Sequence, residues 1–148
     1  DRLTQRTRSG EAFVATLAGA RIEAGADVLL CRDAGETARG GLAPLELAPG
    51  QTGVWDDRWE ITAGDAPLVV SALKGRSAAL SATDRARLVT LPASARPALP
   101  LISRQDARPY CPALDGPHLA AEGGARARLL VLARFKAATG QIDQESVT

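Results

Sequence analysis

The apolar residues of this sequence come in short runs, and turn residues separate each run from the next. Runs of this length, bounded by glycine, proline or aspartate, predict β-strands, and the short connections between them favour antiparallel pairing. None approaches the roughly 18 apolar residues that a membrane helix needs, so we expect no membrane association. The runs lie at 13–17, which also suits one helical turn, and at 20–23, 27–32, 51–55, 58–62, 67–73 and 101–103.

The best-defined turn is Asp56-Asp57, which joins the runs 51–55 and 58–62. A two-residue hairpin turn needs positive φ, which aspartate tolerates better than most residues other than glycine. We expect both carboxylates to be solvated at the hairpin tip, where they would not form a general acid–base pair. Trp55 and Trp59 flank the turn and are expected to pack in the core. A second hairpin is predicted around 24–26.

Helical signals are fewer than strand signals. Ser81 or Thr83 is expected to cap a short helix over 84–89, which ends before Pro92. Residues 125–135 hold the densest apolar run and suit either a strand or a buried helix, while 93–100 are expected to be irregular or extended and 110–111 a short strand. The predicted fold is therefore α+β, with five to eight strands, mostly in antiparallel hairpins, and one or two short helices.

The domain boundaries follow from the same pattern. Residues 1–10 are expected to be a linker or the end of a preceding helix, 11–135 an α+β domain, and 136–148 a polar tail. Two small subdomains that meet near 75–95 are a second arrangement left open. The sequence contains no methionine, so we expect it to be a piece of a longer protein. Two isolated cysteines and the absence of a signal peptide predict a cytoplasmic location.

Charge is unevenly distributed along the chain. The net charge is −4 over residues 1–73, +5 over 74–108 and 0 over 109–148, and Lys74 and Lys136 are the only lysines among 18 basic residues. Arginine suits bidentate phosphate contacts, so the basic stretch predicts a surface that faces a polyanion. A solvated face with incidental arginines is the alternative, and GC-rich coding would also explain the arginine excess.

Catalytic and metal-binding patterns are not recognised in the sequence. His118 is the only histidine and stands in a turn sequence, with no identifiable nucleophile. Cys31 and Cys111 are isolated and lack the spacing of zinc ligands, and the glycine-rich stretch 35–44 lacks the lysine of a phosphate-binding loop. We therefore expect no catalytic residues, metal or cofactor on this chain.

Several short segments in fixed order carry a family resemblance. They are Thr16-Leu17-Ala18-Gly19-Ala20-Arg21-Ile22, Leu30-Cys31-Arg32-Asp33, Leu45-Glu46-Leu47-Ala48-Pro49-Gly50, Trp55-Asp56-Asp57-Arg58-Trp59, Ala98-Leu99-Pro100 and Gly116-Pro117-His118-Leu119. This series resembles the C-terminal region of proteobacterial tRNA(Ile)-lysidine synthetases, with their TL-GG-R and CRE strands, L-L-PG turn, WDGRF hairpin, and LPAL and PHL segments. The resemblance covers about 12–119, and it departs from the family at Asp57, a glycine there, and at Asp33, a glutamate there.

The resemblance implies a fragment, because the family's Ser-Gly-Gly-x-Asp-Ser pyrophosphatase loop does not occur in this sequence. The whole enzyme uses ATP and magnesium to adenylate the wobble cytidine of the CAU-anticodon isoleucine tRNA, and lysine then displaces AMP. The C-terminal region is understood to help recognise the tRNA body, especially the acceptor stem. The implied partners are tRNA and the chain's own absent N-terminal catalytic domain, with a homodimer left open.

Recognition of an A-form stem relies on phosphate and 2′-hydroxyl contacts, which arginines on a rigid scaffold supply. The predicted phosphate contacts are the six arginines of the basic stretch, Arg76, Arg85, Arg87, Arg96, Arg104 and Arg108. The alternative function is a structural or protein-interaction module that mediates dimerisation or docks a catalytic domain and does not touch RNA.

Overall fold

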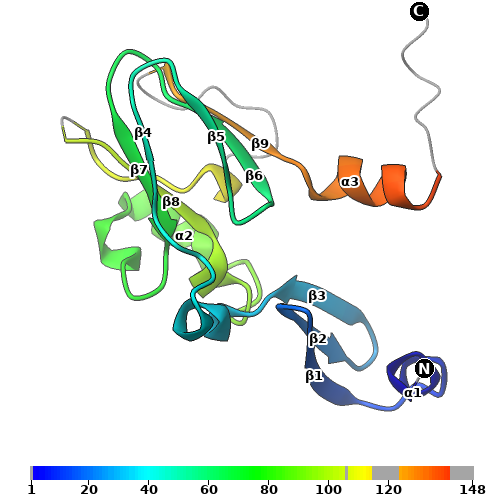
Figure 1. The fold of residues 1–148 in the computed structure, drawn as a ribbon. Helices are drawn as coiled ribbons and strands as arrows, with labels where there is room; N and C mark the ends of the chain where they lie inside the picture. Colours follow the sequence, from blue (N-terminus) through cyan, green and yellow to red (C-terminus); the bar gives the residue numbers. More distant parts are fainter. Residues whose placement is uncertain (1, 106, 115–123, 141–148) are drawn as a thin grey trace, which may run out of the picture.

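The structure is a computed structural model that describes residues 2–105, 107–114 and 124–140. Within these residues, nine strands form three antiparallel sheets of three strands each, accompanied by three α-helices and several short 3-10 turns (Figure 1). The α+β class predicted from the sequence is therefore confirmed, with more strands and helices than expected. His118 and the 116–119 segment lie outside the described residues.

The N-terminal part is a helix followed by a three-stranded sheet. Helix α1 (Arg2–Arg8) precedes strands β1 (Phe13–Leu17), β2 (Ala20–Ala24) and β3 (Val28–Arg32), which pair in sequence order. The 24–26 hairpin is confirmed, and 13–17 is a strand. In Figure 1 this sheet lies below the other two. Among the described residues, no strand residue of this sheet belongs to either of the two hydrophobic clusters.

The other two sheets share the larger hydrophobic cluster. One has the order β4 (Leu45–Leu47), β7 (Leu68–Ala72), β8 (Pro100–Ser103), and the other has the order β5 (Thr52–Trp55), β6 (Trp59–Thr62), β9 (Arg126–Leu129). Buried residues alternate with more exposed ones along β6 and β7, so one face of each sheet packs into this cluster. In β8, Ile102 joins the larger cluster, whereas its neighbour Leu101 is buried in the smaller one. Trp55 and Trp59 are both buried in this cluster, as predicted, and the Trp55 indole N–H donates to the Ala43 carbonyl at 2.8 Å.

Helix α2 (Ala82–Leu88) covers the smaller cluster. The Ser81 Oγ accepts a hydrogen bond from the Asp84 N–H at 3.0 Å, which confirms the predicted cap. Leu88 is buried with residues from β8 and neighbouring loops. The 3-10 turns are η1 (Ala34–Arg39), η2 (Ser77–Ala79), η3 (Arg96–Ala98) and η4 (Pro112–Leu114).

The C-terminal apolar run divides into two elements. Residues 126–129 form β9, which pairs with β6, and the chain then turns into helix α3 (Val131–Ala138), which has no buried residue. The prediction of either a strand or a buried helix for 125–135 was therefore incomplete, because the first half of the run is a strand and the second half is an exposed helix. Around 110–111 the expected strand is reduced to an isolated bridge between Tyr110 and Ile102. Within the described ranges, no helix has the length and apolar character to cross a bilayer.

Candidate RNA interface and ion-pair network

The predicted RNA-binding arginines fall in two places. Arg85 and Arg87 lie in the last turn of α2, where cations are favoured by the helix dipole. Arg96 of η3 joins them, because its Nη2 donates to the carbonyls of Val89 at 2.9 Å and Leu91 at 2.7 Å, just beyond α2. We call Arg85, Arg87 and Arg96 the α2 arginine group.

The other three arginines follow the ends of β7 and β8. Arg76 donates to the hydroxyls of Ser71 at 2.6 Å and Ser103 at 3.3 Å. Arg104 has a largely buried side chain that lies 3.8 Å from the exposed carboxylate of Asp65. Arg108 is exposed. The six residues therefore do not have equivalent environments.

Some of these guanidinium groups already hold the fold together. Arg85 donates from Nη1 to the Leu80 carbonyl at 2.6 Å, and Arg96 satisfies carbonyls that the short helix leaves unpaired. Arg76, Arg85, Arg87 and Arg108 are nevertheless exposed residues that can present N–H donors to solvent. An arginine that donates to a carbonyl keeps further donors, so a structural contact and a phosphate contact are compatible.

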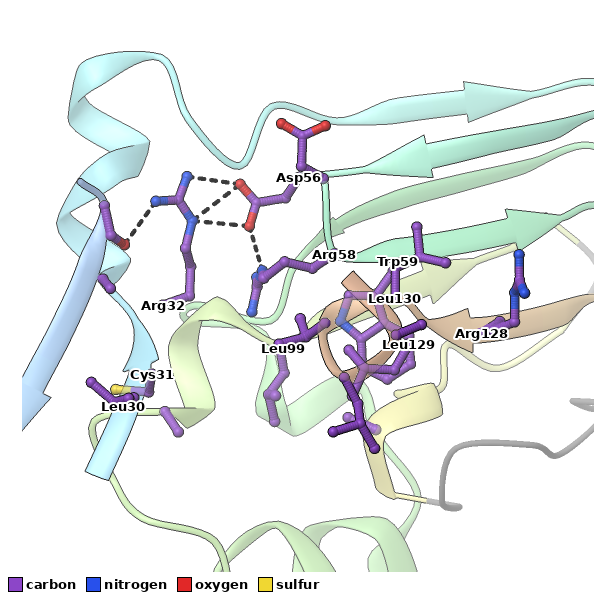
Figure 2. A pocket seen from close by; sticks show the side chains of 18 of the residues that line it. Leu30, Cys31, Arg32, Asp56, Arg58, Trp59, Leu99, Arg128, Leu129 and Leu130 are labelled. Carbon is purple, nitrogen blue, oxygen red and sulfur yellow. Dashed lines mark hydrogen bonds and ion pairs between the residues drawn. The ribbon is translucent and has the colours of Figure 1, made fainter. Parts of the chain in front are cut away.

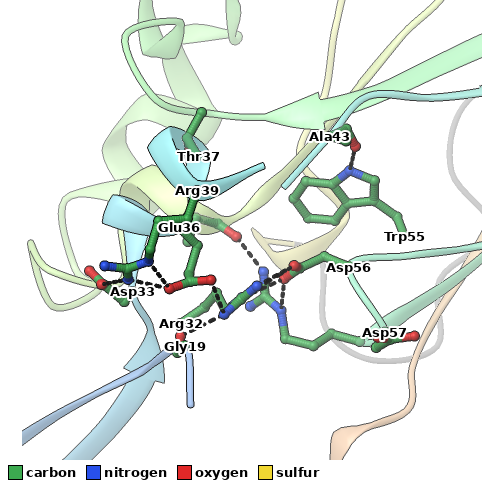
Figure 3. A network of polar contacts seen from close by, with 12 residues as sticks. Gly19, Arg32, Asp33, Glu36, Thr37, Arg39, Ala43, Trp55, Asp56 and Asp57 are labelled. Atoms are coloured by element: carbon green, nitrogen blue, oxygen red, sulfur yellow. Dashed lines mark hydrogen bonds and ion pairs between the residues drawn. The ribbon is translucent and has the colours of Figure 1, made fainter. Parts of the chain in front are cut away.

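A second polar site lies at the β5–β6 turn, where sequence reasoning expected only solvated carboxylates (Figure 3). Asp56 has a side chain that is only 4% exposed, so the prediction of a solvated tip was wrong for this residue. Its carboxylate accepts from Arg32 Nη2 at 2.8 Å and Nε at 3.0 Å, and from Arg58 Nε at 2.6 Å. Arginine binds carboxylate well in this forked geometry. We call Asp56, Arg32 and Arg58 the Asp56 network.

The Asp56 network connects four elements. Arg32 ends β3, and its Nη1 donates to the Gly19 carbonyl in the β1–β2 turn at 2.7 Å. Arg58 begins the return of the hairpin, and its Nη2 donates to the Ala98 carbonyl of η3 at 2.7 Å. The carboxylate between them therefore ties the N-terminal sheet to the hairpin and to η3. Arg32 and Asp56 are 24 positions apart, so no local spacing marks the pair.

Electrostatics agree with this geometry. Burial alone would raise the pKa of Asp56, but the hydrogen bonds and charges of Arg32 and Arg58 outweigh it and hold that pKa below its ordinary value. Hydrogen bonding to Asp56 raises the pKa of Arg32, whereas burial lowers the pKa of Arg58. Both guanidinium groups remain charged at neutral pH, because arginine ordinarily titrates above about 12.

The neighbouring aspartate differs from Asp56. Asp57 is exposed, and both residues have positive φ, 49° at Asp56 and 54° at Asp57, as the sequence predicted for this turn. The Asp57 carbonyl accepts a hydrogen bond from Arg134 of α3. The turn thus contacts the N-terminal sheet through one aspartate and α3 through the other.

An open groove of about 1140 Å³ lies beside the Asp56 network (Figure 2). Leu30 of β3 lies on one wall, and Leu99 lies between it and the other wall, which holds Leu129 at the end of β9 and Leu130 just before α3. The free thiol of Cys31 also borders the groove. Among the described residues, no three His, Cys, Asp or Glu side chains gather in a way that would hold a metal ion.

Sequence comparison identifies one enzyme that is similar to this chain over almost its whole length. The tRNA(Ile)-lysidine synthase of Caulobacter vibrioides is 58% identical over 148 residues, which is 99% of this chain. The match covers 36% of the relative, so the chain spans about a third of that protein's length. No family model matches, and no solved structure gives a significant match. The resemblance to tRNA(Ile)-lysidine synthetases inferred from the motifs is thereby confirmed.

Proposed function

We propose that this chain is the C-terminal, non-catalytic part of a tRNA(Ile)-lysidine synthetase and that it binds tRNA. The observation that carries the proposal is the 58% identity to a protein named for that activity, over 99% of this chain. In the proposed parent, a cytoplasmic enzyme, the rest of the polypeptide binds ATP and magnesium and attaches lysine to the wobble cytidine.

The basic stretch 74–108 supports an RNA-facing role. Its net charge is +5, and its exposed arginines include Arg85 and Arg87 in the last turn of α2. Phosphate contacts of this kind require cations on a rigid element and do not depend on aromatic residues. Aromatic residues make up only 3% of this sequence. The α2 arginine group is therefore the proposed centre of the tRNA surface, with Arg76, Arg104 and Arg108 at its periphery.

A matched pair of charge reversals tests this surface. Helices α1 and α2 are both seven residues long and both carry two arginines in the last turn. Arg87→Glu in α2 should weaken tRNA binding and reduce the slope of log K against log salt by about 1 or more. Arg8→Glu in α1 makes the same charge change on an exposed helix end, so it is the control. Filter binding of CAU-anticodon tRNA(Ile) to the full-length protein, at several salt concentrations, gives both values.

Equal losses for Arg87→Glu and Arg8→Glu would mean a general effect of net charge and would contradict the proposed surface. Unchanged binding in Arg87→Glu and in Arg76→Glu would place RNA contact elsewhere or remove it from this chain. Circular dichroism of each variant shows that any loss of binding is not a loss of fold.

A protein-docking role is the second candidate, and a separate observation favours it. Leu30 and Leu132, which line the groove, and Phe135 of α3 are exposed, although side chains of this size are usually buried. A module that only docks would bind tRNA no better than a neutral protein of the same size. The binding experiment above distinguishes the two functions.

A further inference from the structure

One face of the N-terminal sheet is apolar almost throughout and partly uncovered. Side chains alternate between faces along a strand, so the register places three cross-strand rows together. These rows are Phe13-Ala24-Val28, Ala15-Ile22-Leu30 and Leu17-Ala20-Arg32. Phe13 is buried with the Arg6 guanidinium of α1 over its ring, whereas Leu17, Val28 and Leu30 are exposed. A sheet face of this composition normally packs against another layer.

Helix α3 presents a second apolar stripe without a partner among the described residues. Val131, Leu132 and Phe135 are all exposed, and their spacing of three and four residues puts them on one side of the helix. The helix is held at its start by buried Leu130 and by the hydrogen bond from Arg134 to the Asp57 carbonyl. Its position is therefore defined although its apolar side is uncovered.

These two apolar surfaces border the same groove. Leu30, Val131 and Leu132 all line it. Figure 2 shows Leu30 on one side, Leu129 and Leu130 on the other, and Leu99 between them. The groove has apolar walls, one formed by a sheet face and the other by α3. Such a groove suits a partner amphipathic helix that places its own apolar side between the two walls. The charged groups among the described lining residues are largely paired, because Arg32 and Arg58 share the Asp56 carboxylate and Arg128 forms an ion pair with Glu60. The apolar walls are therefore the main feature that a partner helix would recognise.

We propose that this groove docks the apolar side of an amphipathic helix, contributed by the part of the same synthetase that lies outside this chain. This inference rests on the proposed function, because it takes the chain to be one part of a longer enzyme. The Caulobacter vibrioides relative supports that source, since the chain spans only 36% of its length and most of such a polypeptide is available to fill the groove. The docked helix would hold the RNA-binding part in a set position relative to the catalytic part.

Site-specific photocrosslinking in the full-length protein tests the occupant. Leu132→p-benzoylphenylalanine places the reactive group in the groove, where Leu132 is 61% exposed. Val89→p-benzoylphenylalanine is the matched control, because Val89 is 64% exposed and lies after α2, outside the groove-lining residues. We expect the group at 132 to cross-link within one polypeptide to an apolar segment outside this chain. The control should give no such product.

A second pair of variants tests whether the apolar wall is required. Leu30→Asp puts a charge on the groove face of β3 at a residue that is 66% exposed, and should abolish the cross-link from position 132. Val14→Asp makes the same change on the opposite face of the sheet, where Val14 is 57% exposed, and should leave the cross-link intact. Both positions are exposed, so neither substitution is expected to unfold the protein.

Several outcomes would overturn the proposal. A cross-link between two copies would assign the groove to dimerisation, and a cross-link only within this chain would mean that α3 closes it. Equal products at 132 and 89, or equal effects of Leu30→Asp and Val14→Asp, would leave the groove without a specific occupant. The readout is separate from tRNA binding: Arg87→Glu tests the RNA surface while the cross-link tests docking, so failure of one is distinguishable from failure of the other.

Discussion

The guanidinium of Arg32 donates two hydrogen bonds to the carboxylate of Asp56, at 2.8 Å from Nη2 and 3.0 Å from Nε. Arg32 is the last residue of β3 in the N-terminal sheet, and Asp56 is the first residue of the β5–β6 turn. The contact therefore joins one sheet to another. Because the strands of the N-terminal sheet add no residue to either described hydrophobic cluster, its placement depends on polar contacts of this kind.

Removing the charge of Asp56 should therefore destabilise the protein strongly. Asp56→Asn keeps the size of the side chain and tolerates the positive φ, but leaves Arg32 and Arg58 without their anion. We expect a loss of about 3 kcal/mol in the free energy of unfolding, the value typical of a broken buried pair. Asp57→Asn is the matched control in the same turn and should cost less than about 0.5 kcal/mol. Urea unfolding at neutral pH measures both, and equal costs would contradict the importance of the network.

The same carboxylate should make stability sensitive to acid. Its pKa is held below the ordinary value, so its contribution is complete above the unfolded-state pKa of about 3.9 and is lost as pH falls through the lower native-state pKa. The difference in Tm between the native protein and Asp56→Asn should be constant above about pH 5 and shrink below about pH 4. Asp56→Asn should retain some acid sensitivity, since hydrogen bonds also lower the pKa values of Glu11, Glu23 and Asp33. A difference that grows in acid would contradict this assignment.

Glycine at position 19 should be required by the Asp56 network as well as by the β1–β2 turn. It has a φ of +77°, and a Cβ built there would lie 1.8 Å from Arg32 Nη1. Gly19→Ala therefore has a backbone cost of about 1–2 kcal/mol and also displaces the Arg32 guanidinium. In a protein that already carries Asp56→Asn, the Arg32–Asp56 contact is weakened beforehand, so Gly19→Ala should cost only the backbone strain. A double-mutant cycle by urea unfolding measures this coupling, and simple additivity would mean that Arg32 moves aside without loss.

Glycine at position 57 should stabilise the hairpin. Asp57 has a φ of 54° with an exposed side chain. Asp57→Gly relieves the left-handed strain, so we expect a gain of about 0.5–1 kcal/mol and a higher Tm. Asp56→Gly relieves similar strain but removes the buried carboxylate, so it should lower the Tm. If both substitutions changed the Tm in the same direction, backbone conformation would outweigh the network at this turn.

The sequence predicted those features whose causes are local. The hairpins around 24–26 and at Asp56-Asp57 follow from turn residues between short apolar runs, and the Ser81 cap follows from its position before α2. The burial of Asp56 could not be predicted in this way, because it depends on an arginine that tertiary structure brings to the turn. Likewise, the basic stretch was recognisable, but the contacts of Arg96 with carbonyls after α2 and of Arg104 with Asp65 depend on the fold.

The division of 125–135 into a strand and a helix has the same origin. Its apolar residues suit both a strand and a helix. Pairing with β6 makes the first part a strand, and this pairing ends at Leu129. Beyond that residue no strand in the described part of the chain extends the sheet, and the chain turns into α3.

The pairing of β6 with β9 also sets an order of events during synthesis. Glu60 and Arg128, which form an ion pair across these strands, are 68 positions apart, whereas β5 and β6 are neighbours in a hairpin. A nascent chain that has released only the hairpin has an open strand edge at β6, which other chains can pair with. That edge is protected only after Leu129 leaves the ribosome. Premature termination before Arg126 would therefore release a product prone to aggregate, so the completeness of translation matters to the solubility of this protein.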